Sequence, residues 1–222
     1  MRTGTINNYV KFSKKFGGVR KCYEGKPTIA VGGFQCDTSL MPAYPNVMAA
    51  GTLVYADETA GVRSIVPIYT FKVLEVDTTN NKIKVEKVET GTIAKVGMVL
   101  GVVGSDLTQA VSNVSTVSTI DSTNDGYDIL TVDAVASEGT AFVAEGDVLA
   151  EFDGTTKKIK NIPNGLTYCD NVLDTDAYAI DIDYVWNCME KPVLERRMPP
   201  LTASLKKALI ENECYFRFSN RK

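Results

Sequence analysis

The stretch Gly139–Gly154 reads GTAFVAEGDVLAEFDG, and a similar stretch stands earlier in the chain. Gly91–Gly104, GTIAKVGMVLGVVG, also begins with Gly-Thr and passes through a second glycine into an apolar run. A glycine before such a run most simply marks a tight turn into a β-strand. A weaker third copy is GTLV at Gly51–Val54. We therefore expect a fold that reuses one β unit.

Each of the two long copies is preceded by a predicted hairpin. Residues Tyr69–Val88 alternate apolar and polar side chains on both sides of the polar connector Asp77–Asn81. Residues Val114–Val135 repeat this pattern around Ser122–Gly126, whose Asp-Gly ending favours a hairpin turn. The repeat spans about 69–104 and 114–154. It predicts a mainly β fold, either a compact barrel or a sandwich.

The chain is expected to have three parts. Residues 1–28 form a basic, extended N-terminal arm, 29–160 form the β domain, and 161–222 form a C-terminal strand, a proline-rich extension and a short helix. The strand is expected at Tyr178–Trp186. The extension is KPVLERRMPP, whose prolines oppose a helix.

The short C-terminal helix is expected within LTASLKKALIENE, Leu201–Glu213. Thr202 or Ser204 could cap its N-terminus. One apolar face combines Leu205, Ala208 and Leu209. A short amphipathic helix cannot build its own core, so it should dock either on the β domain or on a partner.

Charge is segregated along the chain. The formal net charge is −3. Residues 1–26 carry seven basic residues and one acidic residue, and residues 191–222 carry eight basic and three acidic residues, so the middle is strongly acidic. Two basic ends around an acidic body favour arms that reach an acidic partner, although solvated lysines at chain ends are an equal alternative.

Composition argues against several classes of function. The chain has no histidine, which removes the usual general base and most zinc sites, so a non-enzymatic role is favoured. Five scattered cysteines without C-x-x-C spacing predict free thiols made in a reducing cytoplasm. Without an apolar run of 18 residues or a signal-peptide pattern, neither a membrane partner nor secretion is expected. Neither phosphate-binding glycine motif occurs, nor does the lysine triplet of biotinyl or lipoyl domains, so no cofactor is expected.

Two further groups of residues are candidate binding sites. One is a carboxylate group that could bind calcium, but the EF-hand pattern is missing and the solvent face of a strand is favoured: Asp170, Asp174, Asp176, Asp181 and Asp183. The other is the N-terminal segment, which mixes Phe12, Phe16 and Tyr23 with the basic residues Lys11, Lys14, Lys15, Arg20, Lys21 and Lys26. This mixture could bind nucleic acid through phosphate contacts and base stacking. An arm anchored by its aromatic residues is favoured over that alternative.

Three segments resemble auxiliary head proteins of tailed bacteriophages, meaning the decoration (or cement) and head-fibre proteins that bind the outside of the capsid shell. They are AAGTLVYAD (Ala49–Asp57), VGMVLGVVG (Val96–Gly104) and AEGDVLAEFDG (Ala144–Gly154). The resemblance covers roughly residues 30–154 and rests on short motifs. Residues 161–222 have no equivalent in the smallest decoration proteins and would fit a larger auxiliary protein that ties neighbouring subunits together.

The resemblance implies a non-enzymatic structural protein located in the virion and made in the host cytoplasm. Its expected partners are the major capsid protein and neighbouring copies of itself, and a homotrimer would fit the three-fold positions of a shell. The residues expected to bind a partner are Lys11, Lys14, Lys15, Arg20, Arg196, Arg197, Lys206 and Lys207 as polar contacts, with Leu205, Leu209, Phe216 and Phe218 as apolar anchors. A nucleic-acid-binding structural protein that acts through its basic ends is the alternative.

Overall fold

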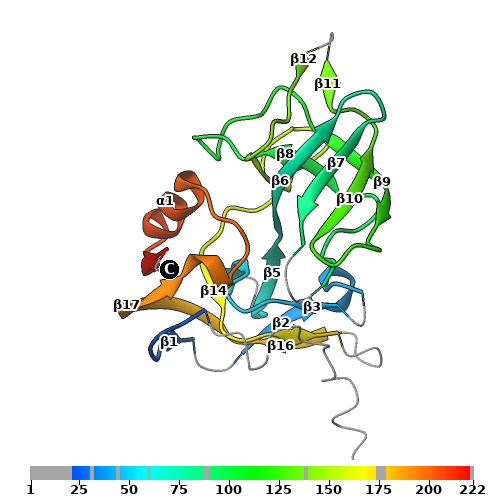
Figure 1. The fold of residues 1–222 in the computed structure, drawn as a ribbon. Coiled ribbons are helices and arrows are strands. Elements are labelled where there is room, and N and C mark those ends of the chain that lie inside the picture. Colours follow the sequence, from blue (N-terminus) through cyan, green and yellow to red (C-terminus); the bar gives the residue numbers. More distant parts are fainter. Residues whose placement is uncertain are drawn as a thin grey trace, which may run out of the picture.

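The computed structural model is mainly β, with 46% of residues in strands, 8% helical and one α-helix in the part described (Figure 1). The described residues are 22–30, 33–43, 46–59, 61–87, 91–137, 140–173 and 179–220. The predicted fold class is confirmed.

Six strands close into a barrel in the order β10-β7-β6-β13-β8-β9 (upper part of Figure 1). Their bounds are β6 Thr70–Asp77, β7 Lys82–Glu86, β8 Val99–Val102, β9 Ser115–Asp121, β10 Tyr127–Val132 and β13 Val148–Glu151. The two predicted hairpins are β6–β7 and β9–β10, and the two glycine-led strands are β8 and β13. The whole barrel is therefore built from the two copies of the repeat.

The two copies are related by an approximate two-fold axis. Exchanging β6 with β9, β7 with β10 and β8 with β13 reproduces the same ring of neighbours. The register agrees, because the pair Val148↔Lys72 has the counterpart Val99↔Thr116. The axis passes through two pairs in which equivalent residues of the two copies meet, namely Ile83↔Leu130 and Gly101↔Ala150.

The glycine before each glycine-led strand is required by backbone geometry. Gly97 has φ +88° and Gly146 has φ +90°, a region that residues with a Cβ rarely adopt. The amide of Gly97 donates to the carbonyl of Val117 at 2.8 Å, and that of Gly146 donates to the carbonyl of Val73 at 2.9 Å. The glycine-led sequence recurs because each copy makes the same turn, and each turn bonds to the equivalent valine, Val117 or Val73, of the other copy.

Equivalent side chains also fill the barrel interior. Ile83 and Leu130 are equivalent and fully buried, and so are two further apolar pairs: Val73 with Val117 and Leu100 with Leu149. The copies differ at Phe71, whose counterpart is the buried Ser115.

Eight strands outside the barrel form a second sheet, which we call the basal sheet. Its order is β1-β17-β14-β4-β5-β2-β16, and β18 adds parallel to β17. The strands are β1 Thr28–Ile29, β2 Phe34–Asp37, β4 Leu53–Asp57, β5 Ser64–Ile68, β14 Gly165–Thr167, β16 Ala179–Ile182, β17 Tyr184–Leu194 and β18 Tyr215–Ser219. The minor elements are β3 Val47–Met48 with β15 Asn171–Val172, β11 Ala136–Ser137 with β12 Thr140–Ala141, and the 3-10 helices η2 Thr38–Leu40 and η3 Glu195–Arg197.

The barrel is an insertion in the chain of the basal sheet. Strands before it, including β4 and β5, share that sheet with strands after it, including β14 and β17. The predicted boundaries near residues 28 and 160 therefore do not separate structural bodies. The C-terminal region is not an arm, because its strands pair with strands from the beginning of the chain.

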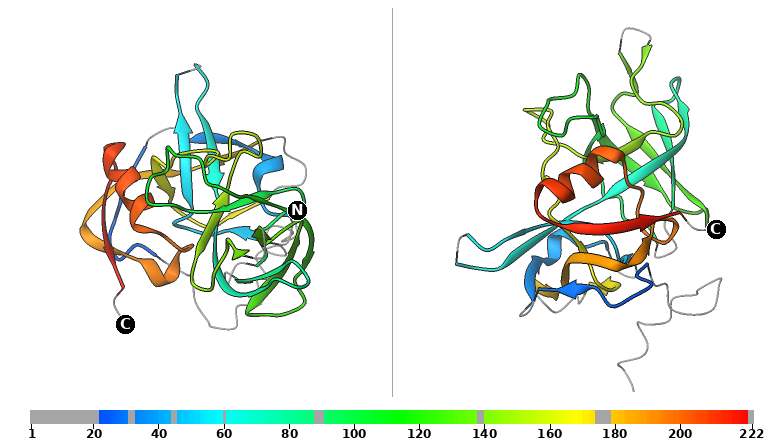
Figure 2. Two further views of the ribbon diagram at one scale, coloured as in Figure 1. Left: turned by 90° about the horizontal axis from the view of Figure 1, so that it is seen from above. Right: turned by 90° about the vertical axis from the view of Figure 1, so that its left-hand side faces the viewer.

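Helix α1 (Ala203–Glu211) lies between the barrel and the basal sheet (Figure 2, right). Thr202 is the predicted cap, and its Oγ1 accepts a hydrogen bond from the amide of Leu205 at 3.2 Å. The predicted apolar face is buried, and it packs in a second core with Leu53 of the basal sheet and Phe152 after β13. The helix therefore docks on its own chain.

The predicted strand Tyr178–Trp186 is two strands. Residues 174–178 lie outside the described part, β16 ends at Ile182, and β17 begins at Tyr184. The interruption at Asp183 lets both Ile182 and Val185 be fully buried, which an unbroken alternation would not allow.

Candidate partner interface

The first described residues run along β17. The amide of Leu194 donates to the carbonyl of Cys22 at 2.7 Å, and Tyr23 forms a bridge with Val193. Further along, β1 pairs with the beginning of β17. Residues 22–29 therefore form one border of this long strand.

Strand β18 also pairs with β17, and its last pair brings Ser219 opposite Leu194. Both ends of the described chain thus meet Leu194, one through Cys22 and the other through Ser219. Cys22 and Ser219, which are far apart in sequence, therefore lie beside the same residue of β17. We call the surface formed by residues 22–29, 184–197 and 215–219 the terminal face.

Three large apolar side chains are exposed on the terminal face. Trp186 is 38% exposed, Met189 54% and Tyr215 45%. Trp186 is the extra residue of a β-bulge, because Ile29 pairs with Val185 while the neighbouring Thr28 pairs with Asn187. A bulge changes the direction of a side chain, which explains how the tryptophan reaches the surface. Tyr215 is the register partner of Asn187, next to Trp186.

The charges of the terminal face favour a negatively charged partner. Of its acidic residues, Glu24 pairs with Arg197 at 3.8 Å and Glu195 with Lys206 at 2.6 Å, while Glu190 is exposed. Four exposed cations have no ion pair within the described part of the chain: Lys26, Lys191, Arg196 and Arg217. Residues 1–21, which lie outside the described part, contain six basic residues and no acidic one.

The predicted apolar anchors lie mostly inside the molecule. Leu205 and Leu209 are fully buried in the second core, so the prediction that they contact a partner is wrong for the folded chain. Phe216 and Phe218 are half-buried against that core. The cause is that α1 and β18 complete this chain's own packing.

The predicted polar contacts divide into three groups. Arg196 is exposed, whereas Lys206 and Arg197 are engaged in the ion pairs with Glu195 and Glu24. Lys207 pairs with Glu211 one turn along α1 at 3.3 Å. Lys11, Lys14, Lys15 and Arg20 lie outside the described residues. Sequence reasoning missed Trp186, Met189 and Tyr215, because their exposure depends on the bulge and on the pairing of β18.

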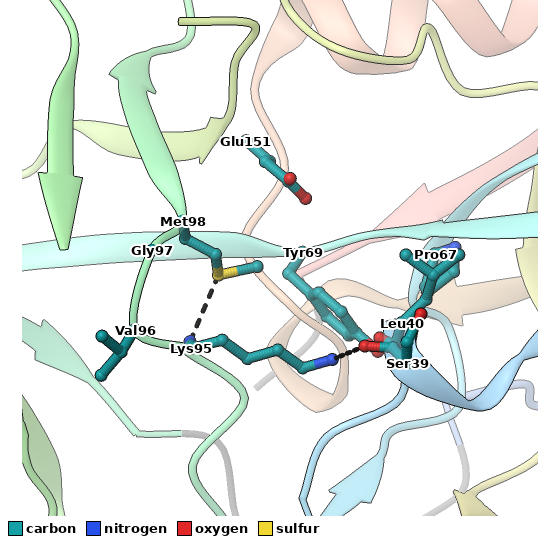
Figure 3. Close-up of a pocket in the computed structure, with 9 residues that line it drawn as sticks. All are labelled: Ser39, Leu40, Pro67, Tyr69, Lys95, Val96, Gly97, Met98 and Glu151. Atoms are coloured by element: carbon teal, nitrogen blue, oxygen red, sulfur yellow. Dashed lines mark hydrogen bonds between the residues drawn. The ribbon is translucent and has the colours of Figure 1, made fainter.

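A small pocket lies where the barrel meets the basal sheet (Figure 3). It encloses about 190 Å³ and is lined by Ser39, Leu40, Pro67, Tyr69, Lys95, Val96, Gly97, Met98 and Glu151. Ligand pockets usually measure about 300–1,000 Å³. The volume of this pocket is below that range.

The polar groups of this pocket are already satisfied. Lys95 and Tyr69 both donate to backbone carbonyls of η2, and the Glu151 carboxylate accepts from Lys160 Nζ at 2.6 Å. Burial lowers the pKa of Lys95 by desolvating its ammonium group. The arrangement fixes the barrel to the basal sheet, and it does not place a nucleophile beside a free base.

The carboxylates that could form a calcium site are not gathered within the described residues. Asp174 and Asp176 lie outside the described residues. Asp170 accepts a hydrogen bond from the amide of Ala50 at 2.8 Å, and Asp181 lies on β16. Within the described ranges, no three acidic or cysteine side chains are close enough to bind a metal ion.

Comparison with known proteins finds no family model, no curated protein and no solved structure that matches this chain. Among the described residues, no helix has the length and apolarity needed to cross a membrane.

Proposed function

We propose that this chain is a non-enzymatic structural protein of a virus particle, which binds and stabilises the capsid shell as an auxiliary or decoration protein. The observation that carries the proposal is the meeting of both ends of the described chain, Cys22 and Ser219, at Leu194 of β17. Together with the exposed cations of the terminal face, it supports a single attachment side. Several weak contacts made from one side add through their high effective concentration.

The charge of the barrel supports the idea that the molecule has one attachment side. Residues 70–153 carry five basic and fourteen acidic residues, a net charge of −9. A molecule with an acidic barrel and a cationic terminal face is oriented by a charged surface before contact. This orientation suits a protein that must bind a shell in one direction.

Quantitative mass spectrometry of purified particles from the native source tests the proposal. A ratio near one copy per shell subunit supports an auxiliary shell role. Far fewer copies would indicate a fibre or vertex component. Absence of the chain from particles would contradict the proposal.

A nucleic-acid-binding structural protein is the second candidate. The observation in its favour is that Trp186 and Tyr215 are exposed on the same face as Lys191 and Arg217, since aromatic and basic side chains together bind single strands. A gel-shift titration at rising salt distinguishes the two, because phosphate contacts weaken steeply with salt. Binding that is absent at low salt would remove this candidate.

A further inference from the structure

We propose that the terminal face binds the acidic barrel of a second copy of this chain. The inference deepens the proposed function by naming one partner of the attachment side. Its test uses the isolated protein, so its failure is separate from absence of the chain from particles.

The first argument is charge complementarity within the same sequence. The terminal face has four exposed cations and one exposed acid, Glu190, outside its internal ion pairs. The barrel of every copy carries a net charge of −9 over residues 70–153. Opposite fields on two parts of one molecule favour head-to-tail encounter and oppose contact between identical faces.

The second argument is the apolar content of the face. Trp186, Met189 and Tyr215 belong to residue types that are enriched in protein interfaces, and Trp and Tyr are frequent hot spots. Trp186 is next to Asn187, the register partner of Tyr215, and Met189 follows on β17. The exposed cations belong to the same segments, so the terminal face combines apolar and charged side chains, as interfaces do.

The third argument is that the two surfaces differ, so the contact is heterologous. A heterologous contact between two copies leaves the pair with one unused barrel and one unused terminal face, so further copies can add to form a ring or an open chain of subunits. Neighbouring copies around a shell could be connected in this way.

The chain carries its own reporter, because Trp186 is its single tryptophan. The emission of Trp186 should shift to the blue as protein concentration rises, since association buries the indole. About 1 M salt, where the Debye length is about 3 Å, should reverse the shift. Sedimentation of the full chain should show matching growth in mass. A monomer with unchanged emission up to the solubility limit would overturn the proposal.

Two substitutions test the face itself. Arg217→Glu retains the reporter and should weaken self-association about tenfold or more, and Trp186→Ala should do the same by sedimentation. The matched controls are Lys158→Glu, an exposed lysine outside the face, and Ile210→Ala, an exposed apolar residue of α1. Circular dichroism of each variant confirms folding. Equal weakening by controls and test variants would overturn the assignment.

A titration with single-stranded DNA at low salt tests whether nucleic acid, and not a second copy of the chain, binds the terminal face. A blue shift that requires DNA, with no self-association, would assign the face to nucleic acid and overturn the proposal.

Discussion

At the scale of single residues, Gly97 and Gly146 make the turn that both copies of the repeat share. Each has a strongly positive φ, and an added Cβ would meet nothing within 4 Å at either site. Alanine at either position should therefore act through backbone strain alone, destabilising the chain by about 1–2 kcal/mol. Urea unfolding measures this cost, which should be nearly equal at the two sites.

Gly126→Ala is the matched control. Its Cβ would also be in open space, but its φ lies outside the left-handed region. A cost at Gly126 as large as at Gly97 would show that the effect is not due to positive φ.

Cysteine reactivity is a second prediction at this scale. Cys169 is exposed, whereas Cys22, Cys36, Cys188 and Cys214 are buried. Burial also raises the pKa of Cys36 to about 12, which leaves its thiol protonated at neutral pH. An aromatic disulfide reagent should label one thiol per folded chain and all five after unfolding. Rapid labelling of Cys22 would contradict the packing of residues 22–29 along β17.

At the scale of elements, a buried ion pair joins Lys87, the residue after β7, to Asp128 of β10 in the other copy. Lys87 Nζ lies 3.2 Å from Asp128 Oδ1, with side-chain exposures of 13% and 5%. It also donates to the carbonyls of Ser122 and Asn124. Lys87→Met should cost about 3–5 kcal/mol, because the Asp128 carboxylate would remain buried without its cation.

The double variant Lys87→Met/Asp128→Asn tests the cause. Removing the orphaned charge should recover part of the stability measured by urea unfolding, although the carbonyls of the turn still lose their donor. Additive losses from the two single substitutions would show that the pair is not coupled.

Aspartates that accept hydrogen bonds in turns predict that the stability of the fold decreases in acid. Hydrogen bonds from nearby Ser, Thr or Asn residues, as from Thr123 to Asp121, lower the pKa of six aspartates: Asp37, Asp57, Asp77, Asp106, Asp121 and Asp153. A folded pKa below the unfolded value of about 3.9 stabilises the fold above that value, and this contribution is lost as pH falls through the folded pKa.

The urea concentration at the unfolding midpoint should therefore decrease as the pH is lowered below about 4. Asp121→Asn keeps an acceptor that does not titrate, so it should reduce the slope in this range. An unchanged slope would show that this turn does not contribute.

At the scale of the whole molecule, α1 and β18 are part of the core. Leu209→Ala should cost about 2–5 kcal/mol in urea unfolding, because Leu209 is fully buried between the barrel and the basal sheet. Ile210→Ala, at a position 58% exposed, should change stability by about 0.5 kcal/mol or less. Removing residues 191–222 should accordingly unfold the basal sheet. A truncated chain with unchanged unfolding would contradict this role.

The sequence predicted the parts of the fold that depend on local pattern. The hairpins around Asp77 and Asp121, the glycine-led strands and the Thr202 cap follow from alternation, turn residues and helix periodicity. Closure of the barrel was not predictable from one copy, because it depends on pairing such as Ile83↔Leu130 between copies. The position of Trp186 was missed for a similar reason, since pairing with β1 creates the bulge.

Because Cys22 and Ser219 meet at Leu194, the same fold is compatible with a different order of its segments along the chain. Because only β17 separates Cys22 from Ser219, a linker across this strand could join these two positions and make the described backbone circular. A new opening could then be made in the exposed turn between β6 and β7. Such a circular permutant would start and finish in the inserted barrel and leave the basal sheet uninterrupted.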